Sequence, residues 1–262
     1  MNRTYLLRGA VFGLLLAVLC SFSPSSKADQ SQPIIAVASN LRVVIEEIAQ
    51  LFHQHTGLNV RFSFGSSGNL TRQILQGAPF EMFMSADEDY VFRLAGSGTA
   101  IDRGKIYAFG RIVAFSPKGS PLQQVEFPVG YGAMFGKHTG KRFAIANPEL
   151  APYGRAAKEV LERADLWKTM QPHLIYGENI SQTGQFILSG STIGGIIAYA
   201  QALAPPFKGS GTYQLIAETF HNPIAQRMVL LHRAGETAKR FYGFIGENQA
   251  LEIFRKYGFT VK

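Results

Sequence analysis

Phe64-Gly65-Ser66-Ser67-Gly68-Asn69-Leu70-Thr71-Arg72-Gln73-Ile74 is the stretch in which a predicted strand gives way to a predicted helix. The strand is the alternating apolar run over residues 58–64, and apolar residues four apart mark the helix. Ser66 or Ser67 is suited to cap this helix, because a short hydroxyl can accept hydrogen bonds from its first amides. The remaining amides and the helix dipole favour an oxyanion there, without any lysine or arginine. A capped turn without a ligand is the simpler explanation of this stretch taken alone.

A second copy of the same arrangement lies upstream. Residues 34–38 form a short apolar run that predicts a strand, and Ser39-Asn40-Leu41 opens an amphipathic helix. Parallel strands place both helix starts at the same edge of a sheet, where open α/β folds bind their ligands. Two such helix starts make a better anion site than one, so the pair favours ligand binding.

The composition of the 262-residue chain is that of a globular protein, with 46% hydrophobic and 17% charged residues. The formal net charge is +8, but no cluster of Lys and Arg alternates with aromatic residues, so nucleic acid is not an expected partner. Cys20 is the single cysteine, which leaves the rest of the chain without a disulfide or a thiol nucleophile.

Residues 1–28 have the features of an export signal. Arg3 and Arg8 precede an apolar run over residues 10–20, and Ser26-Lys27-Ala28 provides small residues at the −3 and −1 positions of a cleavage site. The run is short for a membrane span. A lipid anchor on Cys20 is the less favoured alternative, because the bulky Leu19 precedes it. We therefore expect a cleaved signal peptide and a periplasmic protein.

The rest of the chain alternates predicted strands and helices, which indicates an α/β fold with mostly parallel sheets. Long extended runs at residues 111–116 and 224–232 flank a middle α/β block. We expect them to cross between two lobes, with lobe 1 at 29–111 and 227–262 and lobe 2 at 112–226. A last strand of the middle block is expected at residues 194–199.

Catalytic motifs are absent from the sequence. Gly65-Ser66-Ser67-Gly68 lacks the final glycine of a nucleophile elbow, and no nucleotide-binding glycine pattern occurs. His53 and His55 are two residues apart and so lie on different sides of a helix, which argues against a bare metal cation. The acidic run at residues 87–89 is better explained as helix capping. We expect no enzyme, no catalytic residues and no cofactor.

Several motifs together resemble the periplasmic molybdate-binding proteins of ABC importers, over nearly all of residues 34–262. They include Ala38-Ser39-Asn40-Leu41, the stretch 64–74, Gly77-Ala78-Pro79, Ser85-Ala86-Asp87, Ala146-Asn147-Pro148-Glu149, Glu178-Asn179-Ile180-Ser181-Gln182 and the ending at residues 250–259. The resemblance implies a two-lobed periplasmic binding fold of type II, in which each lobe is a mixed, mostly parallel sheet flanked by helices. The ligand would lie in the cleft between the lobes.

The resemblance also implies the ligand residues. The anion ligands of the family fall on Ser39, Ser67, Tyr153 and Ile180, the last through its backbone amide. Asn40 matches an asparagine of one branch of the family. Another branch has a tyrosine where this chain has Ala198, and Asn40 with Tyr153 can take its place. Tyr199 is adjacent, but it would point to the opposite face of a strand.

The implied ligand is molybdate or tungstate, passed by a monomeric binding protein to the permease of an ABC importer. Neutral donors favour an anion that is fully deprotonated, because a protonated oxygen finds no acceptor among them. This favours molybdate, tungstate or sulfate over hydrogen phosphate. Two alternatives stay open at this point: a binding protein for sulfate or another tetrahedral oxyanion, and an exported hydrolase.

Overall fold

The computed structural model describes residues 32–136 and 140–261. The expected signal peptide, and the first residues of the expected lobe 1, lie outside these ranges. In the described part of the chain, no helix is long and apolar enough to cross a membrane.

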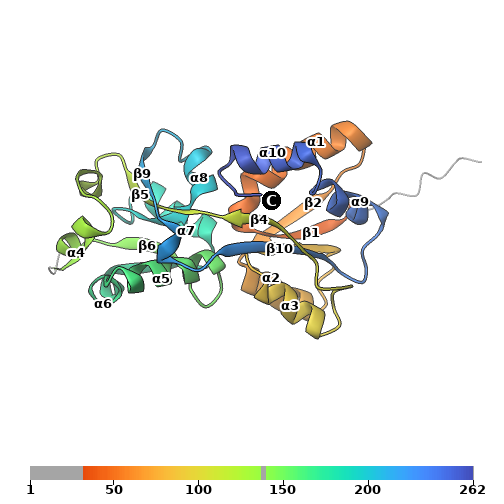
Figure 1. Cartoon of the computed structure of the whole chain (residues 1–262), viewed down its shortest axis with the longest axis horizontal. Helices are drawn as coiled ribbons and strands as arrows, with labels where there is room; N and C mark the ends of the chain where they lie inside the picture. The colour runs from red at the N-terminus through yellow and green to blue at the C-terminus, as the bar shows by residue number, and fades with distance from the viewer. Residues whose placement is uncertain (1–31, 137–139, 262) are drawn as a thin grey trace, which may run out of the picture. The chain divides into compact units, whose positions relative to one another are not determined.

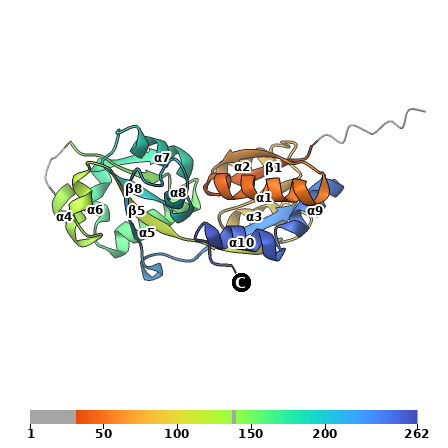
Figure 2. The same ribbon diagram turned by 90° about the horizontal axis from the view of Figure 1, so that it is seen from above.

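Two five-stranded sheets organise these residues. The labelled strands and the helices beside them can be followed in Figures 1 and 2. The first sheet has the strand order β2-β1-β3-β10-β4 and the second β7-β6-β8-β5-β9. The strands are β1 (Ile34–Ala38), β2 (Arg61–Gly65), β3 (Met82–Met84), β4 (Lys105–Gly110), β5 (Ile112–Pro117), β6 (Phe143–Ala146), β7 (Leu174–Gly177), β8 (Gly195–Ala198), β9 (Gly211–Leu215) and β10 (Ile224–Leu230).

In each sheet three neighbouring strands are parallel, and a fourth strand runs antiparallel to the strands on both sides of it. β1 pairs in parallel with β2 and β3, and β10 runs antiparallel to β3 and β4. In the second sheet β6 pairs in parallel with β7 and β8, and β5 runs antiparallel to β8 and β9. The predicted fold class, mixed α/β sheets flanked by helices, is confirmed.

Helices cover the faces of both sheets, because each presents an apolar face to the sheet. In Figure 1 α1 and α10 lie on one side of the first sheet. Lys256 of α10 donates to Glu47 of α1 at 2.8 Å. The longer helices are α1 (Arg42–Thr56), α2 (Ser67–Leu75), α3 (Asp89–Gly96), α4 (Val129–Phe135), α5 (Pro152–Arg163), α7 (Ile180–Leu188), α9 (Glu236–Phe244) and α10 (Asn248–Lys256). The short ones include η1 (Ser39–Leu41), a 3-10 helix, with α6 (Trp167–Met170) and α8 (Tyr199–Leu203).

Four clusters of buried apolar side chains stabilise the fold. Two of them include side chains of the first sheet, around Ile35 and around Phe83, and two include side chains of the second, around Ile145 and around Phe115. These residues are at most 1% exposed. Burial of each such side chain contributes about 1.5–3 kcal/mol, so the structure has a core at each sheet.

The crossing from the first sheet to the second is sharper than the sequence suggested. The expected strand at residues 111–116 is β5, but the extended run begins earlier, as β4 in the other sheet. Arg111 alone separates the two strands. The chain returns through residues 216–223 to β10, which pairs only with strands of the first sheet.

The strand expected at residues 194–199 ends one residue early. β8 stops at Ala198, and Tyr199 is the first residue of α8. The expectation that Tyr199 points to the opposite face of a strand is therefore wrong, because the residue is helical. β7 was not predicted, because only Leu174 and Gly177 of its four residues are buried.

Candidate functional site

Four helices begin close together, and contacts link them in a ring. Asn40 Nδ2 of η1 lies 3.4 Å from the Tyr153 hydroxyl of α5. The amide of Gly68, in the first turn of α2, donates to the Leu150 carbonyl before α5 at 2.9 Å. The remaining two contacts join Asn69 of α2 to Glu178 before α7, and Ser181 Oγ of α7 to the Ser39 carbonyl of η1 at 3.2 Å.

The ring brings together all five predicted ligand residues. Each of them lies in the first one or two residues of its helix and is buried: Ser39 and Asn40 in η1, Ser67 in α2, Tyr153 in α5 and Ile180 in α7. A pocket of about 220 Å³ is lined by Ser39, Asn40 and Ser181 but not by the other three. The five residues are therefore grouped by the contacts between the helix starts, and they do not all line this pocket.

The helix caps leave specific amides without an acceptor inside their own helices. Asn179 Oδ1 accepts from the amides of Ser181 and Gln182, so the Ile180 amide at the first position of α7 is not capped. In α2 the Ser66 hydroxyl accepts from the Asn69 amide at 3.3 Å, and the first amide is that of Ser67. Since the first amides of a helix have no intrahelical acceptor, each helix start can donate to an anion.

Tyr153 supplies the first amide of its helix for a different reason. Pro152 occupies the first position of α5 and has no N–H, and its fixed φ suits a helix start. The amides of Gly154 and Arg155 both donate to the Ala151 carbonyl. The Tyr153 amide is therefore the third candidate donor of the ring.

One of the two serines predicted as the cap of α2 has that role, and the other has a different partner. Ser66 caps α2, whereas Ser67 Oγ accepts from the Ala86 amide at 3.0 Å. Ser39 does not cap η1 either, since the cap residue is Ala38. Among the described residues the protons of both Ser39 and Ser67 are left without an acceptor, so each hydroxyl can donate to an anion.

A buried polar network lies behind Asn40. The Asn40 side-chain amide lies 3.0 Å from one end of the Gln226 amide, and the other end of Gln226 lies 3.1 Å from the Tyr153 hydroxyl. Tyr107 Oη lies 2.9 Å from Gln226 Oε1 and 2.9 Å from the Ser85 carbonyl. Burial raises the pKa of Tyr107 and of Tyr153, so both phenols keep their protons. Sequence reasoning missed Gln226 and Tyr107, because they lie in β10 and β4 and not at a helix start.

Gly110 makes room for this network. A Cβ at this position would lie 2.2 Å from the Tyr153 hydroxyl oxygen and 2.8 Å from Gln226 Nε2. Any side chain there would displace one of the two, so the close approach of Tyr153 and Gln226 requires glycine.

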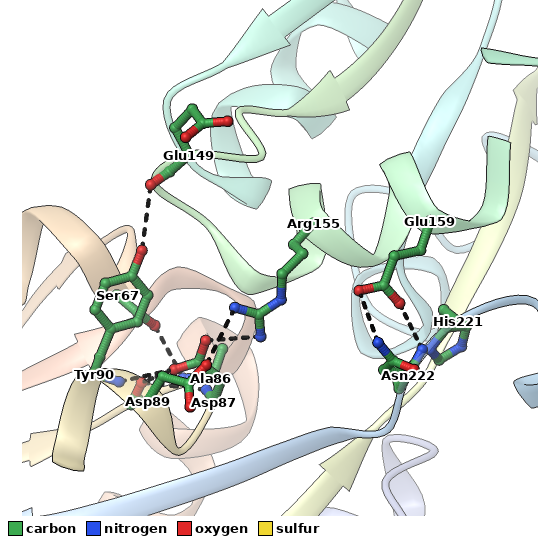
Figure 3. A network of polar contacts seen from close by, with 11 residues as sticks. Ser67, Ala86, Asp87, Asp89, Tyr90, Glu149, Arg155, Glu159, His221 and Asn222 are labelled. Carbon is green, nitrogen blue, oxygen red and sulfur yellow. Dashed lines mark hydrogen bonds and ion pairs between the residues drawn. The ribbon is translucent and has the colours of Figure 1, made fainter. Parts of the chain in front are cut away.

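Further polar contacts join residues near these helix starts, as Figure 3 shows. Arg155 of α5 donates to Asp87 at 2.9 Å, and Tyr90 donates to the Glu149 carbonyl at 3.3 Å. Asp87 also accepts from the Tyr90 amide, the capping role expected for the acidic run. Burial raises the pKa of the Asp87 carboxyl, and the Arg155 guanidinium opposes that shift. The described residues contain no group of three or more potential metal ligands.

The chain matches the family model described as bacterial extracellular solute-binding protein over residues 34–260. It belongs to this family, whose members bind solutes and are not enzymes, in agreement with the expectation from the sequence.

Named relatives are consistent with the motif resemblance. The molybdate-binding protein ModA of Rhodobacter capsulatus is 35% identical over 238 residues, which cover 90% of each chain. ModA of Escherichia coli is 29% identical over 240 residues, 90% of this chain and 91% of the relative. The resemblance to molybdate-binding proteins is thereby confirmed.

Solved structures with a similar fold agree with this resemblance. The periplasmic molybdate-binding protein of Azotobacter vinelandii superposes with a TM-score of 0.78 at 28% identity, covering 88% of this chain and 100% of the other. The sulfate-binding protein SubI of Mycobacterium tuberculosis has a TM-score of 0.71 at 17% identity, over 87% and 86% of the two chains. The second comparison shows the shared fold alone.

Proposed function

We propose that this protein binds molybdate, and tungstate by the same contacts, outside the cytoplasm and delivers it to the permease of an ABC importer. The ring of helix starts supports the proposal, because contacts join four helix starts whose first amides have no intrahelical acceptor. The names of the relatives supply the identity of the anion.

The proposed ligands are the Ser39 and Ser67 hydroxyls, the Asn40 side chain, Tyr153 and the Ile180 amide. Each hydrogen bond to a charged oxygen contributes about 1.5–3 kcal/mol. Five such bonds contribute about 7.5–15 kcal/mol together, which is of the order needed to offset the cost of immobilising a small anion. The lobes proposed to close on it are residues 29–111 with 227–262, and residues 112–226, and the protein acts as a monomer.

Calorimetric titration of the purified protein with molybdate, tungstate, sulfate and phosphate tests this function. Molybdate and tungstate should bind most tightly, because a cavity fitted to a larger anion leaves sulfate with stretched hydrogen bonds. Preferential binding of sulfate would assign the protein to the alternative oxyanion. Binding of none of the four would contradict the proposal as a whole.

We further propose that residues 1–28 are removed on export. Intact mass of the exported protein should correspond to a chain that begins near Asp29. A retained, lipid-modified Cys20 would contradict this.

A further inference from the structure

The amides of Asn40 and Gln226 can each be placed with nitrogen and oxygen exchanged, because the two ends have nearly the same size. Hydrogen bonding decides between the two placements. One end of the Gln226 amide lies 2.9 Å from Tyr107 Oη and 3.0 Å from the Asn40 amide, and the other end lies 3.1 Å from Tyr153 Oη. Gln226 is 0% exposed, so bulk solvent does not reach its amide.

Placing the Gln226 oxygen toward Tyr107 leaves the network inconsistent. Tyr107 would then have two acceptors at 2.9 Å, Gln226 and the Ser85 carbonyl, but only one proton. Asn40 would turn its Oδ1 away from Gln226, and that oxygen has no partner although Asn40 is only 3% exposed. An unpartnered oxygen or nitrogen at that position costs about 1–3 kcal/mol in the ligand-free protein, so the two contacts of Tyr107 decide between the placements.

Exchanging the ends of both amides gives each contact of 3.1 Å or less one donor and one acceptor. It leaves the longer contact, 3.4 Å between the Asn40 amide and the Tyr153 hydroxyl, without a shared proton. Tyr107 donates to the Ser85 carbonyl and accepts from Gln226, whose second N–H reaches the Asn40 oxygen. The Tyr153 hydroxyl then donates to the Gln226 oxygen. The Asn40 atom that has no partner in this network is then its nitrogen, which is a donor at the start of η1.

We infer that Gln226, oriented by Tyr107, is a positioning residue that turns the Asn40 nitrogen toward the bound oxyanion. The inference rests on the proposed function. Its consequence is selectivity: with Nδ2 outward the site holds donors only, so an oxyanion that carries a proton has no acceptor for it. With Oδ1 outward the site would accept such a proton and repel a fully ionised oxygen.

The local backbone supports a dedicated role for this glutamine. The register of β10 shifts between Gln226 and Arg227 where the strand pairs with β4. Such bulges re-aim side chains, often next to binding sites. Gln226 is buried in the middle of the first sheet, where an apolar side chain would be the ordinary choice.

The test is the Tyr107→Phe variant, which removes one oxygen and keeps the ring that packs against Phe254. Without the hydroxyl, Gln226 can turn either way, so Asn40 presents nitrogen in only part of the molecules. Molybdate affinity should fall by about threefold to tenfold, while hydrogen phosphate affinity at pH 7 stays unchanged or rises. The readout is the ratio of the two affinities, because a change in stability alone would leave this ratio unchanged.

Tyr131→Phe is the matched control, because Tyr131 is a fully buried tyrosine in the core of the second sheet. It should leave both affinities as in wild type. Gln226→Met, which keeps the length of the side chain and removes both amide ends, should narrow the selectivity in the same way as Tyr107→Phe. Circular dichroism verifies that each variant is folded.

Two results overturn the inference: an unchanged molybdate affinity in both site variants, or a loss of molybdate and hydrogen phosphate affinity by the same factor. Failure of the proposed function is distinguishable, because the wild-type protein would then bind no molybdate. Wild-type binding with unchanged selectivity in the folded variants contradicts only the role of Gln226.

Discussion

Ser66 and Ser67 are adjacent and both buried, yet their hydroxyls have different partners. Ser66 accepts from the Asn69 amide and caps α2. Ser67 accepts from the Ala86 amide beyond β3, at 3.0 Å, and still has its own proton to donate. The difference predicts that one serine affects mainly stability and the other mainly binding.

Ser67→Ala should weaken molybdate binding by about tenfold to a hundredfold, because it removes one donor to a charged oxygen. Ser67→Asp should abolish binding, since two unit charges 4 Å apart repel by about 4 kcal/mol at an effective dielectric near 20. Calorimetry measures both affinities.

The control for both variants is Ser66→Ala. It should lower the free energy of unfolding by about 1 kcal/mol through loss of the cap, with a change in affinity below about threefold. Wild-type affinity in Ser67→Asp would show that the anion lies elsewhere.

At the scale of the secondary-structure elements, the functional groups are backbone amides at helix starts. α7 begins at Ile180 directly after the Asn179 cap, whose φ of −145° and ψ of 173° are extended. A residue that precedes proline prefers this conformation, and proline is tolerated at the first position of a helix. The Ile180 amide can therefore be removed without breaking α7.

Ile180→Pro should weaken molybdate binding by about tenfold or more, because it deletes one N–H donor to a charged oxygen. Ile180→Ala is the control, since it loses the buried side chain and keeps the amide. The two variants should lose comparable stability in urea unfolding but differ in affinity. Equal affinities would exclude the Ile180 amide as a ligand.

At the scale of the whole molecule, the chain passes between the sheets at Arg111 and again between β9 and β10. Contacts at the ring join helices of both sheets, among them the ion pair of Arg155 and Asp87 at 2.9 Å. The sheets are thus linked by two chain crossings and by the contacts at the ring. This is the arrangement expected of a hinge.

Saturating molybdate should lower the radius of gyration in small-angle scattering, because the anion bridges helix starts from both sheets. Arg155→Gln should raise the radius of the ligand-free protein, since it removes the ion pair with Asp87. Arg163→Gln is the matched control on the same helix, because Arg163 contacts Thr219 and Asn222, which follow the second sheet. An identical radius with and without molybdate would argue against hinge closure.

The sequence alone was sufficient for the local features of the site. The start of α2 was predicted, because its cap and the amide that the cap accepts from lie within three residues of each other. Strand and helix alternation predicted the fold class for the same reason, since periodicity is a local property. The ligand residues Ser39, Asn40, Ser67, Tyr153 and Ile180 came from the family resemblance, and their role in binding stays a prediction.

Only the tertiary structure decided which polar groups stand behind those ligands. Gln226 lies 186 residues from Asn40 along the chain and 119 from Tyr107. They meet because β10 inserts between β3 and β4, a sheet order that hydrophobic pattern does not specify. The division of one extended run into β4 and β5 at Arg111 has the same origin. Local hydrogen bonds depend on residues that are close together in the sequence. The orientation of the buried Asn40 amide depends instead on which strands become neighbours in the sheet.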